Sequence, residues 1–299
     1  MMETDDVIPW PVDWRGEAEL HPYVVCDVFT DVPLQGNQLG VFLDGRPFTP
    51  TDMQQIAREL NLAETVFLFP PIAGGDVALR IFTPGRELPF AGHPVLGTAF
   101  VVATSLGANT VTLETGAGLV PVTLERDGER VVFGRMQQPI PTWRVFDRQE
   151  ELLDALGVAE SVLPIELYDN GVKHVYVALA DEAAVSVLTP SFAELAELGV
   201  AANCFAGKDR SWLTRMFYPT IGISEDAATG SAAGPLAIHL ARHNMIRFGE
   251  QIEIRQGAMI NRPSLLYATA NGESNHIDMV EVGGSAVIVA EGEYRIAAP

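Results

Sequence analysis

Apolar and polar positions along the chain predict short strands separated by a few helices. Residues 23–29 form an apolar run of strand type, and residues 66–69 form another. Between them, residues 49–52 predict a helix start, with a Thr cap, a Pro at the first helical position and an acid three residues after the cap. Apolar residues then recur at helical spacing until the helix ends near Asn61. Glu64 is therefore expected at a helix-to-strand junction, where side chains commonly reach into clefts.

An internal repeat is the most informative feature of the pattern. The strand ending Arg-x-Phe-x-Pro occurs at residues 79–84 and again at residues 214–219. Each copy leads through a polar loop into a glycine turn, which contains Gly92 in the first copy and Gly230 in the second. A buried helix is expected after both turns, and this shared order favours a duplication over chance.

The helices expected after the two turns, at residues 95–104 and 232–240, are apolar on nearly all sides and must therefore be buried. Alternating strands follow each helix. These strands are expected at residues 111–125, 131–136, 251–254 and 265–270. The pattern predicts an α+β protein of two pseudo-symmetric domains, each a curved, mostly antiparallel sheet wrapped around one central helix.

Domain boundaries follow from the same pattern. Residues 1–20 are expected to form a loosely ordered N-terminal extension, because they combine acids with prolines and glycines. The first domain is placed at residues 21–143 and the second at residues 144–299. The last strand of the chain is a candidate to return to the first domain.

Composition narrows the class of protein. Apolar residues make up 47% of the 299 residues and charged residues 19%, which is typical of a chain with a substantial core. The net charge of −20 argues against nucleic acid as a partner, because phosphate contacts need a basic face. No apolar run approaches a membrane span, and the acidic N-terminus lacks a secretion signal. The two cysteines cannot form a disulfide framework, so we expect a cytoplasmic protein.

The starts of the two central helices are candidates for a binding site. The first backbone N–H groups of a helix have no internal partner and lie at the positive end of its dipole. Two such starts that meet between the domains would bind carboxylate or enolate oxygens. Gly92 and Gly230 would let the backbone approach the ligand closely. The alternative is that both glycines serve only the turns.

Four side chains near these turns could hold or move protons. Glu64 is the candidate base, although a lone Glu is usually a solvated surface acid. His93 lies at a helix start, so the dipole should favour its neutral form and a role as hydrogen-bond donor or proton relay. Asp226 precedes the second turn and could pair with His93 or orient a substrate. Ser231 offers a hydroxyl at the second helix start.

Other chemical motifs are incomplete. Gly116 and Gly118 lack the third glycine of a dinucleotide site, and neither glycine turn carries the Lys of a P-loop. No glycine stands two residues before Ser231, as a nucleophile elbow would require. His239 and His243 lie four residues apart and could bind a metal, but no third ligand stands nearby in the sequence. We therefore expect neither a metal nor an organic cofactor, and we expect both cysteines to be buried apolar residues.

Several longer motifs carry a family resemblance. They lie at residues 36–37, 61–64, 80–84, 87–94, 138–143, 203–207 and 225–243. On these motifs the chain, from about Tyr23 to its C-terminus, resembles the PhzF-like family of phenazine-biosynthesis isomerases, within the diaminopimelate epimerase superfamily. Gln38 stands where the family usually has Pro, and the first 20 residues are extra.

The resemblance implies a mechanism. The wider superfamily racemises amino acids with two cysteine thiols, one in each glycine turn, and neither turn here carries Cys. What the resemblance implies is a one-base proton shift, with Glu64 as both base and acid. The implied small-molecule substrate is trans-2,3-dihydro-3-hydroxyanthranilate, whose enol product becomes an aminoketone. His93, Asp226, Ser231 and the N–H groups of the two turn glycines would hold it, without metal or cofactor, in an enzyme that is commonly a homodimer.

Two alternatives remain open at the level of sequence. One is an isomerase of the same family that acts on another small amino or hydroxy acid. The other is a catalytically silent protein that uses the same cleft for binding.

Overall fold

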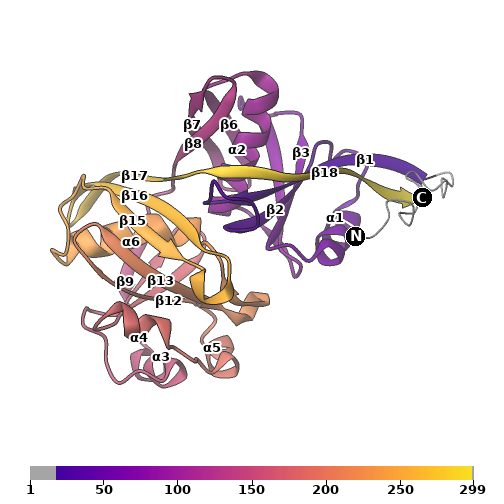
Figure 1. The fold of residues 1–299 in the computed structure, drawn as a ribbon. Coiled ribbons are helices and arrows are strands. Elements are labelled where there is room, and N and C mark those ends of the chain that lie inside the picture. The colour runs from indigo at the N-terminus through magenta and orange to yellow at the C-terminus, as the bar shows by residue number, and fades with distance from the viewer. Residues whose placement is uncertain (1–17, 298–299) are drawn as a thin grey trace, which may run out of the picture.

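The computed structural model describes residues 18–297, which form two lobes joined by long strands (Figure 1). The extension expected at residues 1–20 lies mostly outside the described residues, and Ala18–Leu20 belong to the first strand. The helices are α1 Pro50–Leu60, α2 Gly92–Leu106, α3 Gln149–Leu156, α4 Glu182–Ser186, α5 Phe192–Leu198 and α6 Gly230–Arg242, with short 3-10 turns η2 Pro219–Ile221 and η3 Ala258–Ile260.

Strands make up most of both lobes. The first eight are β1 Ala18–Val28, β2 Asn37–Phe42, β3 Glu64–Phe69, β4 Val77–Phe82, β5 Glu87–Leu88, β6 Thr110–Thr115, β7 Gly118–Asp127 and β8 Arg130–Gln137. The others are β9 Thr142–Val145, β10 Glu166–Asp169, β11 Lys173–Ala178, β12 Ala201–Lys208, β13 Ser211–Tyr218, β14 Ile223–Asp226, β15 Ile252–Gln256, β16 Ser264–Glu273, β17 His276–Gly284 and β18 Ala286–Ala297.

The two halves repeat the same pairing order. In the first half, β1–β2 is antiparallel, β2–β3 parallel, β3–β4 antiparallel and β4–β6 parallel, and β6–β7 and β7–β8 are antiparallel. The second half has the same directions for β10–β11, β11–β12, β12–β13, β13–β15, β15–β16 and β16–β17. This is the α+β arrangement of two similar halves that the sequence predicts.

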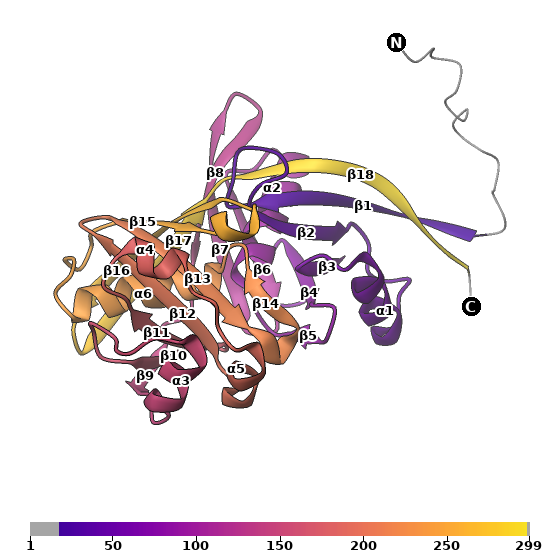
Figure 2. The ribbon, with the colours of Figure 1, turned by 60° about the horizontal axis from the view of Figure 1, so that its bottom comes forward.

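Three pairings connect the halves. The last strand, β18, leaves the second half and pairs antiparallel with β1 along its whole length, as the long arm in Figures 1 and 2 shows. The strand β9 lies across the boundary placed at residue 143 and pairs with β10 of the second half. In the middle, β8 pairs with β17. The two sheets are thus held together by backbone hydrogen bonds.

The helix α1 begins as predicted. Thr49 caps it, and the side chains and backbone N–H groups of Thr49 and Asp52 bond to each other in a capping box. The helix ends at Asn61, which adopts a left-handed conformation with φ 50°. Glu64 is the first residue of β3, at the expected junction.

The central helices α2 and α6 are buried along most of their lengths, as their apolar sequences predict. Both begin at the turn glycine itself, three and two residues before the predicted starts. Pro94 does not prevent this, because the N–H groups of a first turn need no helical partner. In the described part of the chain, no helix has both the length and the hydropathy needed to cross a membrane.

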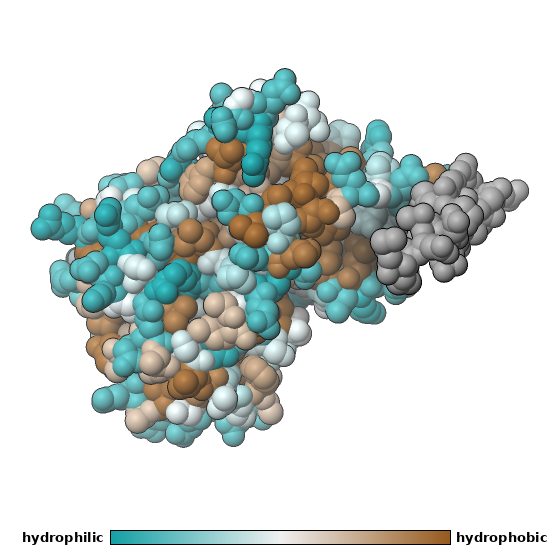
Figure 3. All heavy atoms as spheres, in the orientation of Figure 1, coloured by the Kyte–Doolittle hydropathy of each residue, from teal (hydrophilic) through white to brown (hydrophobic). Residues whose placement is uncertain are grey.

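The surface seen in Figure 3 is mixed. Hydrophilic residues cover most of the rim of this face, and hydrophobic residues gather mainly toward its middle. The surface is acidic overall, since the chain carries a net charge of −20.

Candidate active site

The starts of α2 and α6 touch each other. A Cβ atom on Gly92 would lie 2.7 Å from the carbonyl carbon of Gly230 and 2.8 Å from the backbone N of Ser231. Both neighbours are backbone atoms of α6, so any side chain at position 92 would force the helices apart. Neither Gly92 nor Gly230 has a positive φ. Both glycines therefore serve the close approach of two helix starts rather than a left-handed turn.

Glu64 and His93 form a buried pair at this junction. Glu64 is 6% exposed and His93 4%. The Nε2 atom of His93 lies 3.0 Å from Oε2 of Glu64 and 3.3 Å from the carbonyl oxygen of Gln38. Apart from His93, no described residue lies within hydrogen-bond reach of this enclosed oxygen, so its charge is balanced by His93 alone.

Asp226, the last residue of β14, completes the charged group. Asn37 donates to its Oδ1 at 2.8 Å, and the hydroxyl of Thr229 donates to its Oδ2 at 2.7 Å. The same Asn37 amide lies 3.3 Å from Nδ1 of His93, so it connects Asp226 with His93. Burial and the nearby charge of Glu64 raise the pKa of Asp226 to about 6. Such a pKa suits proton transfer near neutral pH.

The pKa of His93 is shifted upward, against the direction expected from the helix dipole. Burial alone lowers the pKa of His93, but the carboxylates of Glu64 and Asp226 raise it, and the balance lies above the usual value. Asn37 Nδ2 donates to Asp226 and to the carbonyl oxygen of Ala228 and also faces Nδ1 of His93, so the nitrogen of His93 that can donate toward Glu64 is Nε2.

Ser231 is the second residue of α6, and its backbone N lies at the contact with Gly92. Its Oγ is 3.1 Å from Nε2 of His174, a fully buried side chain on β11. Asn170 donates to the carbonyl oxygen of Ser231 at 2.9 Å. That carbonyl would normally accept from the residue four positions later, but this residue is Pro235, which has no N–H. Asn170 thus satisfies a group that proline leaves free.

Sequence reasoning missed several residues that hold the site together. Asn37 and Asn203 stood in motifs of the family resemblance but received no role, and His174 lay in no motif. Gln256 donates to the hydroxyl of Thr229, far from it in sequence. Only the strand pairings bring these polar residues together, so spacing along the chain could not reveal them.

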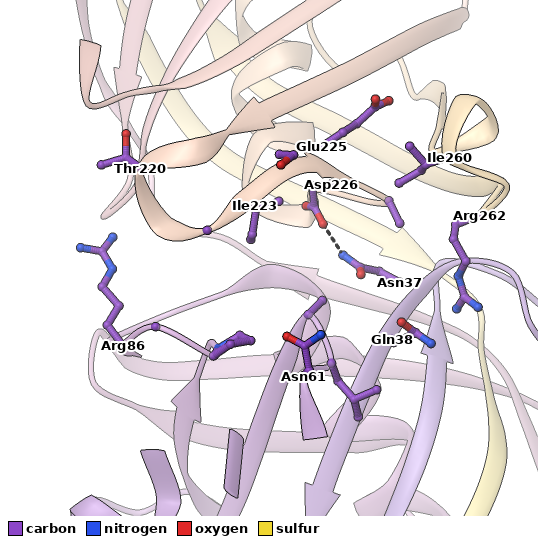
Figure 4. A pocket seen from close by; sticks show the side chains of 17 residues that line it. Asn37, Gln38, Asn61, Arg86, Thr220, Ile223, Glu225, Asp226, Ile260 and Arg262 are labelled. Carbon is purple, nitrogen blue, oxygen red and sulfur yellow. Dashed lines mark hydrogen bonds between the residues drawn. The ribbon is translucent and has the colours of Figure 1, made fainter. Parts of the chain in front are cut away.

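A cleft of about 690 Å³ opens beside this cluster, between the two halves. Asn37, Gln38, Asn61 and Arg86 approach it from the first half (Figure 4). From the second half come Thr220, Ile223, Glu225, Asp226 and Ile260. Asp226 lines the cleft directly, whereas Glu64, His93 and Ser231 lie deeper, next to the helix starts.

The expectation that no third ligand lies near His239 and His243 is wrong, because the fold brings Glu166 next to both. Glu166 of β10 places Oε2 3.2 Å from Nδ1 of His239 and 3.0 Å from Nε2 of His243. Arg242 donates to the same oxygen at 2.6 Å, and Tyr168 donates to it at 2.9 Å. A guanidinium already neutralises this carboxylate, so the cluster suits a structural tie between α6 and β10 better than a metal site.

Both cysteines are buried and unpaired, as expected. Burial raises the pKa of Cys26 and of Cys204 to about 12, which leaves both thiols protonated at neutral pH. Neither can act as the base of a thiol-dependent racemase.

Similar proteins are known. A protein from Pseudomonas chlororaphis named trans-2,3-dihydro-3-hydroxyanthranilate isomerase is 51% identical over 274 residues, which cover 91% of this chain and 99% of that protein. The crystal structure of the Bacillus anthracis phenazine biosynthesis protein, of the PhzF family, has a TM-score of 0.80 at 26% identity and covers 93% of this chain and 100% of its own.

The same fold extends to more distant enzymes. A probable proline racemase from Agrobacterium radiobacter is only 15% identical, yet it has a TM-score of 0.66 and covers 93% of each chain. The model of the phenazine biosynthesis-like protein family, PhzC-PhzF, matches residues 26–292. The chain belongs to the PhzC-PhzF family of phenazine biosynthesis-like proteins.

Proposed function

We propose that the protein is an isomerase that converts trans-2,3-dihydro-3-hydroxyanthranilate to its enol isomer by a one-base proton shift, a step of phenazine biosynthesis. The observation that carries the proposal is the buried Glu64–His93 pair at two touching helix starts. It occurs in a chain 51% identical with a Pseudomonas protein named as an isomerase of this compound.

Glu64 acts as the single base and acid in this proposal. Its carboxylate is buried, and Oε2 lies 3.0 Å from Nε2 of His93, which can donate to it. Glu64 removes the proton from ring carbon 3 of the substrate and returns it to another ring carbon on the same face. The conjugated ring spreads the negative charge that develops between the two transfers. The resulting enol then tautomerises to an aminoketone.

The other groups hold the substrate during this shift. The backbone N–H groups at Gly92 and Gly230 lie at the positive ends of α2 and α6, which favours a carboxylate or an enolate oxygen. Ser231 adds its hydroxyl at the start of α6, and His93 and Asp226 are placed to bind the remaining polar groups of the ring. Asp226, with its pKa raised to about 6, can exchange a proton with a ligand amine near neutral pH.

Turnover of the proposed substrate, followed as loss of its ultraviolet absorbance, tests the proposal. The wild-type enzyme should consume the compound, and Glu64→Gln should fold and bind it without turnover. Glu150→Gln is the matched control, because Glu150 is exposed at the start of α3 and should leave the rate unchanged. A near-normal rate in Glu64→Gln would contradict the mechanism. No turnover by the wild type would contradict the substrate assignment.

The proposal includes a cytoplasmic homodimer that needs no metal or organic cofactor. Two unpaired thiols support a reducing compartment, and the acidic surface supports small molecules rather than nucleic acid as partners. The dimer is carried over from the family. Light scattering should give about twice the chain mass of 32.3 kDa, and a monomer would refute this part.

A further inference from the structure

His174 is a buried polar residue to which the proposed mechanism gives no role. It lies on β11 with an exposed fraction of 0%. Its Nε2 is 3.1 Å from Oγ of Ser231, and its Nδ1 is 3.4 Å from Nδ2 of Asn203 on β12. The three side chains form a line that runs from the sheet to the start of α6.

The position of His174 shows how the two halves have diverged. The repeated strand endings align Phe82 with Phe217, and these residues pair with Thr65 and Ala202. Glu64 therefore corresponds to Ala201, since each precedes one of those paired residues. In the parallel neighbours, Leu39 pairs with Glu64, and His174 pairs with Ala201. The first half thus places its acid where the second has alanine, and the second places a histidine where the first has leucine.

The hydrogen bonds of Asn203 assign the tautomer of His174. The Nδ2 atom of Asn203 also donates to the carbonyl oxygen of Ala201 at 2.9 Å, which fixes this end of the amide as the NH₂ group. The same Nδ2 lies 3.4 Å from the carbonyl oxygen of Val175. An amide NH₂ group accepts no hydrogen bond, so a proton on Nδ1 of His174 would be buried without an acceptor. The neutral ring therefore carries its proton on Nε2 and donates it to Oγ of Ser231.

A neutral imidazole is also what the environment favours. Burial lowers the pKa of His174 to about 3, so the ring stays uncharged over the working pH range. Because Nε2 is a donor, it cannot remove the proton of the Ser231 hydroxyl. This pair is therefore not a serine nucleophile with its base, and the hydroxyl proton is left to point toward another acceptor.

We propose that Asn203 and His174 act as positioning residues that fix the hydroxyl of Ser231 as a donor toward a carboxylate of the bound ligand. Ser231 lies in the first turn of α6, against the start of α2, where backbone N–H groups favour the same anion. Asn170 and the hydroxyl of Tyr176 hold the carbonyl oxygens of Ser231 and Ala232 at 2.9 and 2.6 Å, so this turn is rigid. The identity of the ligand rests on the proposed function, but the tautomer and the donor role do not.

The tautomer can be tested without any ligand. Nitrogen NMR of protein labelled at histidine distinguishes a protonated from an unprotonated ring nitrogen. The signals that are lost in His174→Gln belong to His174. We expect an Nε2–H tautomer that persists down to pH 5. A proton on Nδ1, or a charged ring at pH 6, would overturn the inference whatever the enzyme catalyses.

Binding of two stable aromatic probes tests the donor role. The probes are 3-hydroxyanthranilate and 2-aminophenol, which share a ring but differ in the carboxylate. Ser231→Ala and His174→Phe should each weaken binding of 3-hydroxyanthranilate about fivefold to tenfold, as expected for loss of one hydrogen bond. The double variant Ser231→Ala/His174→Phe should lose no more affinity than either single variant. His174→Gln, unlike His174→Phe, should keep an affinity within about twofold of wild type.

The controls separate positioning from damage to the fold. Neither Ser231→Ala nor His174→Phe should change the affinity for 2-aminophenol. Equal losses for both probes, or losses that multiply in the double variant, would overturn the inference. Failure of the wild type to bind 3-hydroxyanthranilate would overturn the assignment of a ligand carboxylate to the Ser231 hydroxyl. Binding that follows the expected pattern without turnover of the dihydro compound would refute the proposed function and leave this inference intact.

Discussion

Replacement of Gly92 by Ala tests the contact on which the site is built. The added Cβ atom would lie 2.7–2.9 Å from three backbone atoms of Gly230 and Ser231, closer than real Cβ contacts allow. Backbone cannot rotate away as a side chain does, so α2 and α6 must separate by a few tenths of an ångström or more. Overpacking of this kind costs about 1–3 kcal/mol. We therefore expect Gly92→Ala to lose about 2 kcal/mol of unfolding free energy.

Two further glycines make this a graded series. At Gly230 the nearest atoms to an added Cβ are ring atoms of Phe29 at 3.0 and 3.1 Å and the carbonyl carbon of Gly92 at 3.2 Å, so the cost should be smaller. Gly292 on β18 is the control, because its added Cβ would meet only the side chain of Tyr23, at 3.2 Å and beyond. The expected order of destabilisation is Gly92→Ala, then Gly230→Ala, then Gly292→Ala.

Urea unfolding and steady-state kinetics should be measured on all three variants. A separation of the helix starts also moves the N–H groups that face the ligand, so Gly92→Ala should lose at least tenfold in kcat/KM, because misplacement of catalytic groups is costly. Gly292→Ala should keep wild-type kinetics. If Gly92→Ala is as stable and as active as Gly292→Ala, the two helix starts do not make the close contact described above.

Three other predictions concern groups around the site. The pKa of Asp226 is raised to about 6 in the folded protein, so the folded state holds a proton that the unfolded state releases. The unfolding free energy of the wild type should therefore fall by on the order of 2 kcal/mol as the pH rises from 4 to 7. Urea titrations should show no such loss in Asp226→Asn. Glu166→Gln should cost about 2 kcal/mol, because it leaves the guanidinium of Arg242 without its carboxylate, and a calorimetric Tm equal to that of Glu150→Gln would refute this. Asn170→Ala should cost about 1–2 kcal/mol by leaving the carbonyl of Ser231 unpaired, and wild-type urea stability would contradict the proline explanation.

Local signals in the sequence were sufficient for local structure. The cap at Thr49 and the end of α1 at Asn61 depend on residues within a few positions of each other, and both are confirmed. The buried character of α2 and α6 follows from their uniformly apolar sequences and is also confirmed. Their starts were placed too late, because the pattern of apolar residues does not show that a glycine can be the first helical residue.

Contacts between distant segments could not be predicted in the same way. Glu166 lies 73 residues before His239, and the two meet only because β10 lies against the end of α6. The raised pKa of His93 depends mainly on Glu64 and further on Asp226, which the second half supplies. His174 and Asn203 meet through the parallel pairing of β11 and β12. Spacing along the chain contains no information on such pairings.

The central claim is that Glu64 alone removes the proton from ring carbon 3. Single-turnover kinetics with substrate deuterated at that carbon tests it most directly, with loss of ultraviolet absorbance as the signal. We predict that deuterium slows the wild-type reaction and that Glu64→Gln binds the substrate without measurable loss of absorbance. The claim would be contradicted if Glu64→Gln consumed the substrate as fast as the wild type does. It would also be contradicted if deuterium did not slow the loss of absorbance in the wild type.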